Sequence, residues 1–299
     1  MKRIVSICLT FVAVMAAFGQ QPLQTLKVNV ELVQVYATVT DTRGRYVRDL
    51  KREHFQVLED GVEQKLESFA FDDVPVSTGV ILDVGGSMKD NLGVAREGAM
   101  TFLKAGHLDN EFFLVEFNDK AELTEEYTRD LTTLQNHMQF LPSKMTKAPY
   151  DAIHLGLEQL KDAINPRKIL LVMTSGGYIK NAHKASEVRN LARQMDVQIF
   201  NVALPIDTDL HGEINDIAAA SDVIEPIGGR NFVAADAQDY FSICRRIAVA
   251  VRNQYAITYR STNSAHDGKF RKIQIRLSAP KGAPELIVQT RDGYYAQEP

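Results

Sequence analysis

The segment VILDVGGSMKD, residues 80–90, places a carboxylate and a hydroxyl directly after an apolar run. Asp83 ends the run, and Ser87 follows it after a glycine pair. Carboxylate and hydroxyl oxygens are hard ligands of the kind that Mg²⁺ prefers. The segment is therefore typical of a metal-binding loop, although it looks one oxygen ligand short.

Ser87 also raises the question of nucleophilic catalysis, because Gly86 and Ser87 are expected at a strand-to-helix turn. The segment lacks the second glycine of the G-x-S-x-G motif of hydrolases, however. No S-x-x-K motif begins at Ser87 either. The sequence therefore predicts that the protein is not an enzyme. A serine hydrolase that uses Ser87 is kept as a remote alternative, after the two interaction hypotheses given below.

The elements that must position this loop change in character at about residue 76. From there, apolar strands alternate with amphipathic helices, which predicts an α/β fold with a parallel sheet between helix layers. The expected strands are 76–84, 111–117, 121–127, 168–175, 197–204 and 231–235. The expected helices are 90–105, 130–141, 150–163, 185–195, 211–221 and 237–253. Such sheets carry their sites at the carboxyl ends of strands, where Asp83 and Ser175 both stand.

The segments on either side of this part have β character. A hairpin is indicated at Asp60-Gly61, and the segments QYAITYRS, KFRKIQIRLSA and ELIVQTRDGYYA are each expected to form one strand. Neither flank alone is expected to form a stable hydrophobic core. We therefore predict that residues 20–75 and 253–299 form one β-sandwich into which residues 76–252 are inserted. The alternative is a pair of separate small sheets.

The first residues are typical of a secretory signal peptide. Lys2 and Arg3 precede an apolar run, and Ala17-Phe18-Gly19 offers small residues for cleavage. We predict a signal peptide at 1–19 and an exported protein, either periplasmic or secreted, with no membrane span after cleavage. The alternative, an uncleaved anchor, requires a longer apolar run. Cleavage leaves Cys244 as the remaining cysteine, so no internal disulfide is expected.

Composition limits the other function classes. The chain has 299 residues, of which 45% are hydrophobic and 24% charged, as in ordinary globular proteins. The formal net charge of -4 gives no sign of a nucleic-acid surface. None of the 7 His forms an H-x-x-x-H pair, so zinc is not indicated.

Several segments together resemble von Willebrand factor A (VWA) domains. They follow in the order GVILDVGGSM, AREGAMTFL, FFLVEFND, APYDAIHLGLEQL, KILLVMTSGG and VQIFNVAL. With its flanks, the chain is similar to exported bacterial VWA-related proteins of acidobacteria. The resemblance implies the Rossmann-like α/β fold already predicted, and a protein–protein interaction or adhesion module without catalysis.

The resemblance also implies a metal-ion-dependent adhesion site (MIDAS), in which D-x-S-x-S, a Thr and an Asp from three loops hold Mg²⁺ or Mn²⁺. A carboxylate of the partner completes the metal shell. Asp83 and Ser87 match the first loop, whereas Gly85 stands at the position of its first serine. In the second loop Lys147 stands at the Thr position, and in the third Ser175 stands at the Asp position.

These departures suggest a degenerate MIDAS that has lost its metal. A desolvated carboxylate is costly unless it is paired, and a lysine can pair with it as a compact point charge. We hypothesise that Lys147 occupies the metal position and bridges Asp83, with Ser87 and Ser175 forming hydrogen bonds nearby. The alternative is that Lys147 points to solvent and Mg²⁺ or Mn²⁺ still binds weakly.

On this interpretation the partner is another protein, whose identity the sequence does not indicate, and no cofactor is predicted. The partner is expected at the rim formed by the loops after the strand ends. Tyr150 and Tyr178 are the candidate contacts at this rim. The second hypothesis is a metal-dependent adhesion protein.

Overall fold

The computed structural model describes residues 32–71, 73–138, 146–175, 181–204, 229–278 and 284–297. They all belong to one compact unit that extends from Glu31 to Pro299. The expected signal peptide at 1–19 and the expected helix at 211–221 lie outside the described residues. Within the described ranges, no helix is both long and apolar enough to cross a membrane.

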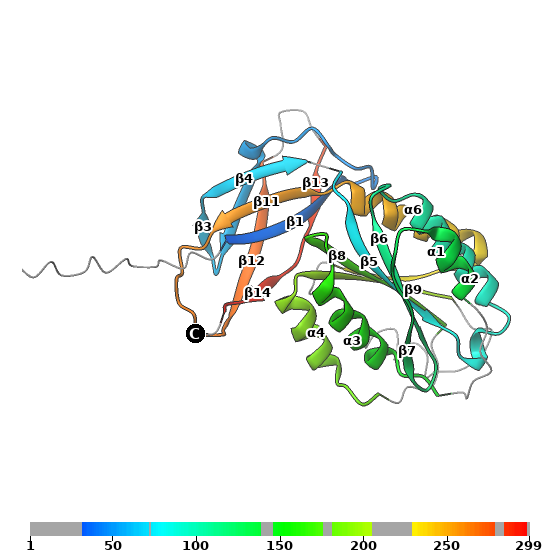
Figure 1. Cartoon of the computed structure of the whole chain (residues 1–299). Helices are drawn as coiled ribbons and strands as arrows, with labels where there is room; N and C mark the ends of the chain where they lie inside the picture. The colour runs from blue at the N-terminus through cyan, green and yellow to red at the C-terminus, as the bar shows by residue number, and fades with distance from the viewer. Residues whose placement is uncertain are drawn as a thin grey trace, which may run out of the picture. The chain divides into compact units, whose positions relative to one another are not determined.

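A six-stranded sheet in the order β10-β9-β8-β5-β6-β7 forms the centre of the α/β part (Figure 1). Its strands are β5 (Val76–Asp83), β6 (Glu111–Phe117), β7 (Ala121–Thr128), β8 (Arg167–Thr174), β9 (Val197–Ala203) and β10 (Arg230–Val233). All neighbours are parallel except β7, which is antiparallel to β6. Residues 118–120 are too short a link for the crossover that a parallel neighbour needs.

Helices cover both faces of this sheet (Figure 1). One face carries α1 (Leu92–Lys104), α2 (Leu131–His137) and α6 (Ala237–Arg252), and the other carries α3 (Pro149–Gln159) and α4 (Ala185–Gln194). Every residue of β5 is buried, because Val80 and Leu82 face one helix layer while Ile81 faces the other. This arrangement confirms the predicted α/β class and explains the continuously apolar strands.

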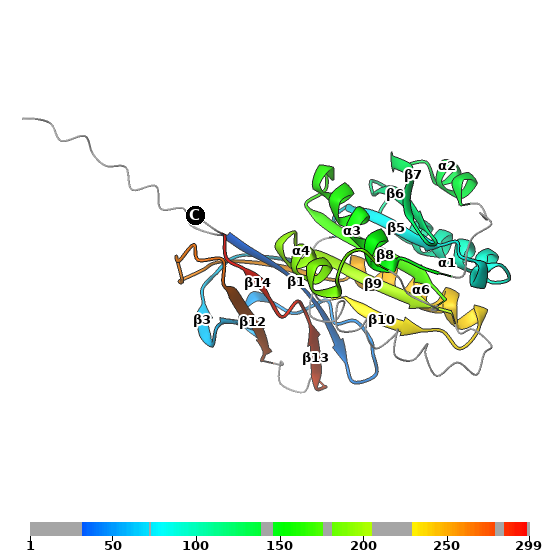
Figure 2. The ribbon, with the colours of Figure 1, turned by 90° about the horizontal axis from the view of Figure 1, so that it is seen from below.

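The remaining strands form two four-stranded antiparallel sheets, β13-β1-β11-β4 and β14-β12-β2-β3 (Figure 2). The strands before the α/β part are β1 (Leu32–Asp41), β2 (Phe55–Glu59), β3 (Val62–Gln64) and β4 (Leu66–Phe71). Those after it are β11 (Tyr255–Arg260), β12 (Phe270–Leu277), β13 (Leu286–Gln289) and β14 (Gly293–Tyr295). Each sheet therefore combines strands from both flanks, and one apolar cluster contains side chains of both.

A buried carboxylate also joins the two flanks. Glu59, at the end of β2, is 2% exposed. It accepts hydrogen bonds from Tyr259 Oη at 2.8 Å, Ser261 Oγ at 2.6 Å and Tyr294 Oη at 3.0 Å. All these donors come from the C-terminal flank, so the polar core of the sandwich needs both ends of the chain.

The structure corrects the strand count of the C-terminal flank. The segment ELIVQTRDGYYA was expected to form one strand, but it forms β13 in one sheet and β14 in the other. β14 begins at Gly293, a position that requires glycine because a Cβ there would lie 2.1 Å from Arg271 O. The chain thus changes sheets at residues 290–292, where the apolar alternation is interrupted.

Candidate interaction site at the Asp83 loop

Asp83 ends β5 at the carboxyl edge of the parallel sheet, with a side chain that is fully buried. Its Oδ1 accepts a hydrogen bond from the Gly85 amide at 2.8 Å. Its Oδ2 accepts from Thr174 Oγ1 at 3.0 Å and from the Ser175 amide at 3.4 Å. The carboxylate is therefore held by its own loop and by the end of the neighbouring strand β8.

Lys147 reaches this carboxylate from the segment that precedes α3. Its Nζ lies 2.6 Å from Asp83 Oδ2, and both side chains are nearly inaccessible to solvent. The same ammonium donates to Ser175 Oγ at 2.9 Å, and Ser175 Oγ lies 3.2 Å from Ser87 Oγ. The structure thus brings together Asp83, Ser87, Lys147 and Ser175.

The backbone around Lys147 is positioned on both sides. The Ala148 amide donates to Asn118 O at 2.8 Å, which attaches the segment to the loop after β6. Pro149 then occupies the first turn of α3, where its missing N–H costs no hydrogen bond. The lysine side chain is consequently directed from a short, constrained segment.

The structure gives a steric reason for the glycine at position 85, which the sequence did not reveal. A Cβ at this position would lie 2.9 Å from Asp83 Oδ1 and 3.3 Å from Lys147 Cε. Any side chain here would therefore press against both members of the ion pair. The glycine and the lysine are compatible with each other, whereas a serine and the lysine are not without rearrangement.

A second polar cluster lies next to this site, and sequence reasoning missed it. Asp151, in the first turn of α3, accepts from the amides of Ala182 at 2.9 Å and His183 at 2.8 Å. The His183 ring stacks on His154 with centroids 3.9 Å apart. Burial raises the pKa of Asp151, but these amide hydrogen bonds and His183 outweigh it and lower the pKa below its usual value. The cluster ties the residues after β8 to α3.

No protein-family model and no curated protein matches the chain. Among solved structures, a von Willebrand factor type A protein from Catenulispora acidiphila is similar over 89% of this chain and 73% of its own, with 9% identity and a TM-score of 0.50. The described part therefore has a VWA-like fold. At such identity the likeness establishes the fold and nothing about function.

Other solved structures match a smaller share of the chain. BatB from Bacteroides thetaiotaomicron matches 60% of this chain and 100% of its own, with 15% identity and a TM-score of 0.49. A mutant of the PilB minor pilin from Streptococcus sanguinis matches 60% of this chain, with 12% identity and a TM-score of 0.47. The matched region spans 61% of the length of that pilin structure. The relationship to acidobacterial proteins stays a prediction.

The Asp83 cluster does not fit a divalent cation in the arrangement described. Asp83 supplies the carboxylate of the cluster, and an ammonium group lies 2.6 Å from it. A dication and an ammonium repel each other strongly when both contact one buried oxygen. Within the described ranges, no group of three or more His, Cys, Asp or Glu side chains is placed to hold a metal.

Among the described residues, no general base lies within hydrogen-bond reach of Ser87 Oγ. Within the described part of the chain, Ser87 Oγ has one polar contact, the Ser175 hydroxyl. A serine nucleophile needs a neutral base in hydrogen-bond reach. The Lys147 ammonium instead contacts Asp83 and Ser175.

Of the two tyrosines expected at the rim, Tyr150 lies within the described residues and Tyr178 does not. Tyr150 is half-buried and packs against the apolar cluster under α3, while its amide donates to Asn181 Oδ1 at 2.8 Å. Tyr178 lies outside the described residues. Tyr150 as a contact for a partner stays a prediction.

Proposed function

We propose that this chain is an exported interaction module in which Lys147 replaces the metal of a degenerate MIDAS. The observation that carries the proposal is the buried contact between Lys147 Nζ and Asp83 Oδ2, at 2.6 Å. The lysine supplies a positive charge from the chain itself where a MIDAS would bind a cation from solution. Partner binding at the rim is therefore independent of divalent metal.

The departures from a MIDAS are physically linked. A serine at position 85 would crowd the lysine stem, because a Cβ there lies 3.3 Å from Lys147 Cε. A carboxylate at position 175 would add a second negative charge beside Asp83, which one ammonium cannot neutralise. Ser175 instead accepts the ammonium at 2.9 Å as an uncharged hydroxyl.

Calorimetric titration with Mg²⁺ and Mn²⁺ tests the replacement. We expect no binding tighter than about 100 μM to the unmodified chain. We expect the triple variant Gly85→Ser, Lys147→Thr, Ser175→Asp to gain binding, because it restores the missing oxygen ligands. The matched control is Gly85→Ser with Ser175→Asp, which keeps the lysine. Equal metal binding by this control and the triple variant would show that the lysine does not exclude the metal.

Site-directed photo-cross-linking tests the interaction role. Lys89 is exposed in the loop after Asp83, and Val62 is exposed on β3 of the sandwich. A benzophenone side chain at position 89 should cross-link a partner in the native extract with EDTA present, whereas one at position 62 should not. Cross-linking that EDTA abolishes would favour the metal-dependent hypothesis instead.

The export part of the proposal has a separate readout. Amino-terminal sequencing of the protein from its native host should find Gln20 as the first residue. A chain that keeps residues 1–19 would contradict cleavage.

A further inference from the structure

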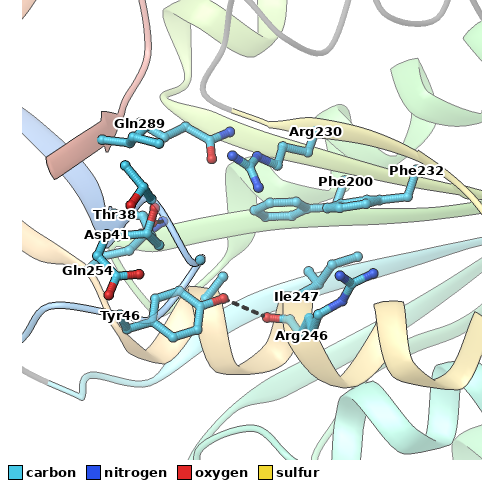
Figure 3. A pocket seen from close by; sticks show the side chains of 15 residues that line it. Thr38, Asp41, Tyr46, Phe200, Arg230, Phe232, Arg246, Ile247, Gln254 and Gln289 are labelled. Atoms are coloured by element: carbon cyan, nitrogen blue, oxygen red, sulfur yellow. Dashed lines mark hydrogen bonds between the residues drawn. The ribbon is translucent and has the colours of Figure 1, made fainter. Parts of the chain in front are cut away.

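A pocket of about 320 Å³ lies where β1 and β13 of the sandwich approach β9, β10 and α6 (Figure 3). It contains none of the residues of the Asp83 cluster. Tyr46, Gln254 and Gln289 line it on the sandwich side, and Phe200, Arg230 and Phe232 on the α/β side. Pockets of this size suit small organic ligands.

The pocket carries positive charge. The exposed side chain of Arg230 makes no hydrogen bond or ion pair within the described part of the chain, and Figure 3 shows its guanidinium directed into the pocket. Arg246, also lining the pocket, has its nearest carboxylate oxygen at 4.0 Å, on Asp239.

The carboxylate that lines the pocket does not offset this charge. Asp41 binds the Arg45 side chain at 2.7 Å, and it accepts the amides of Arg43 and Arg45, each at 2.9 Å. Arg45 therefore neutralises Asp41 from outside the pocket.

The positive charge around the pocket also affects the pKa of Tyr46. Burial raises the pKa of its hydroxyl, and the nearby Arg230, Arg246 and Arg48 oppose that rise. The hydroxyl donates to Arg246 O at 3.3 Å, which fixes the ring at the pocket wall.

Apolar surface complements the charge. Phe200 and Phe232, from the paired strands β9 and β10, both line the pocket, and Ile247, Ala250 and Ile287 add to its apolar lining. Ile287 remains 49% exposed. A flat apolar ring would bury this surface while its charged group reached the arginines.

We propose that this pocket binds a small organic anion, a carboxylate carried on a flat apolar ring. The carboxylate pairs with Arg230 and Arg246, and the ring packs against Phe200 and Phe232. Arginine suits this role because its planar group holds a carboxylate through paired hydrogen bonds.

Binding of benzoate, its neutral isostere benzamide and the cation benzylamine tests the proposal, by ligand-observed NMR on the full chain. We expect saturable benzoate binding with a dissociation constant below about 10 mM, as such a small ligand allows. Benzamide and benzylamine should bind at least about tenfold more weakly, because they lack the charge-assisted pairing. Equal binding of benzoate and benzamide, or no saturable benzoate binding, would overturn the proposal.

Substitutions locate the binding. Arg230→Gln and, independently, Arg246→Gln should each weaken benzoate binding at least about fivefold. The matched control is Arg245→Gln, an exposed arginine on α6 that does not line the pocket. An equal loss in this control would show nonspecific anion binding and overturn the assignment. Thermal unfolding of each variant checks that the fold is intact, and the two pocket variants test the site independently.

Discussion

At the scale of single residues, both oxygens of the buried Asp83 carboxylate have partners in the structure. The Gly85 amide, Thr174 Oγ1 and Lys147 Nζ together occupy both of its oxygens. A buried ion pair adds little net stability as a whole, but removing one partner leaves a charge that nothing compensates. Changing either residue should therefore lower the free energy of unfolding by much more than changing a residue of a surface ion pair.

Lys147→Met should lower the free energy of unfolding by about 3–5 kcal/mol, because Asp83 stays buried without its counter-charge. Urea unfolding measures the loss. The matched control is Lys161→Met, which breaks an exposed pair with Glu158 at 2.7 Å and should cost less than about 1 kcal/mol. Similar losses in both variants would contradict a buried ion pair at Asp83.

The stacked histidines predict a dependence of stability on pH. Burial, followed by the charge of His183, lowers the pKa of His154 below 6.5, while Glu158 and Asp151 oppose the shift and Lys161 adds to it. As pH falls through the unfolded pKa, the unfolded chain takes up a proton before the folded chain does, so folding loses stability. His154→Gln should therefore lose less stability than the unmodified chain between about pH 7 and pH 5. The prediction would be contradicted if the free energies of unfolding of the variant and of the unmodified chain changed equally with pH across this range.

Some site residues could be foreseen and others could not. Asp83, Ser87 and Ser175 are visible in the sequence because they follow apolar strands that end at one edge of the sheet. The pairing of Asp151 with His183 was missed because it depends on how the chain returns after β8, which no local pattern records. The steric role of Gly85 likewise depends on the path of the Lys147 stem.

At the scale of elements, packing between helices decides which positions tolerate change. α1 and α6 lie together on one face of the sheet, and Gly98 of α1 faces Tyr240 of α6. A Cβ at Gly98 would lie 2.4 Å from Tyr240 Cε1 and 3.1 Å from Cys244 Sγ. The glycine therefore sets how closely these helices approach.

Gly98→Ala should lower the free energy of unfolding by about 1–3 kcal/mol, because the buried tyrosine ring must move. Gly93→Ala, in the same helix, is the matched control. A Cβ at Gly93 meets nothing within 4 Å, so this change should stabilise the chain by about 0.5–1 kcal/mol. Thermal unfolding compares the two, and a neutral Gly98→Ala would contradict the close helix contact.

The elements themselves were largely predictable where burial is uniform. The strand expected at 111–117 is β6 (Glu111–Phe117), and the helix expected at 237–253 is α6 (Ala237–Arg252). Prediction failed at β13 and β14, because a short polar interruption at residues 290–292 carries a change of sheet. Such a change is set by the partner strands and not by the segment that makes it.

At the scale of the whole molecule, the sandwich depends on both ends of the chain. β1 pairs with β11 and β13, and β2 pairs with β12. Ion pairs then link the C-terminal flank to the α/β part, through Arg193 with Asp292 at 2.7 Å and Arg291 with Asp196 at 2.9 Å.

Fragments 20–75 and 253–299 should each stay unfolded in isolation, because every sheet of the sandwich takes strands from both. Circular dichroism and the dispersion of NMR amide signals measure this. Folding of either fragment alone would favour separate small sheets, which is the alternative left open by the sequence.

A crystal structure from crystals grown in MnCl₂ tests our proposal that Lys147 stands where a MIDAS holds its metal. We expect Lys147 Nζ in hydrogen-bond contact with Asp83, at about 3 Å or less, with no anomalous manganese signal at the site. A manganese peak beside Asp83, with the lysine displaced beyond about 5 Å, would contradict it.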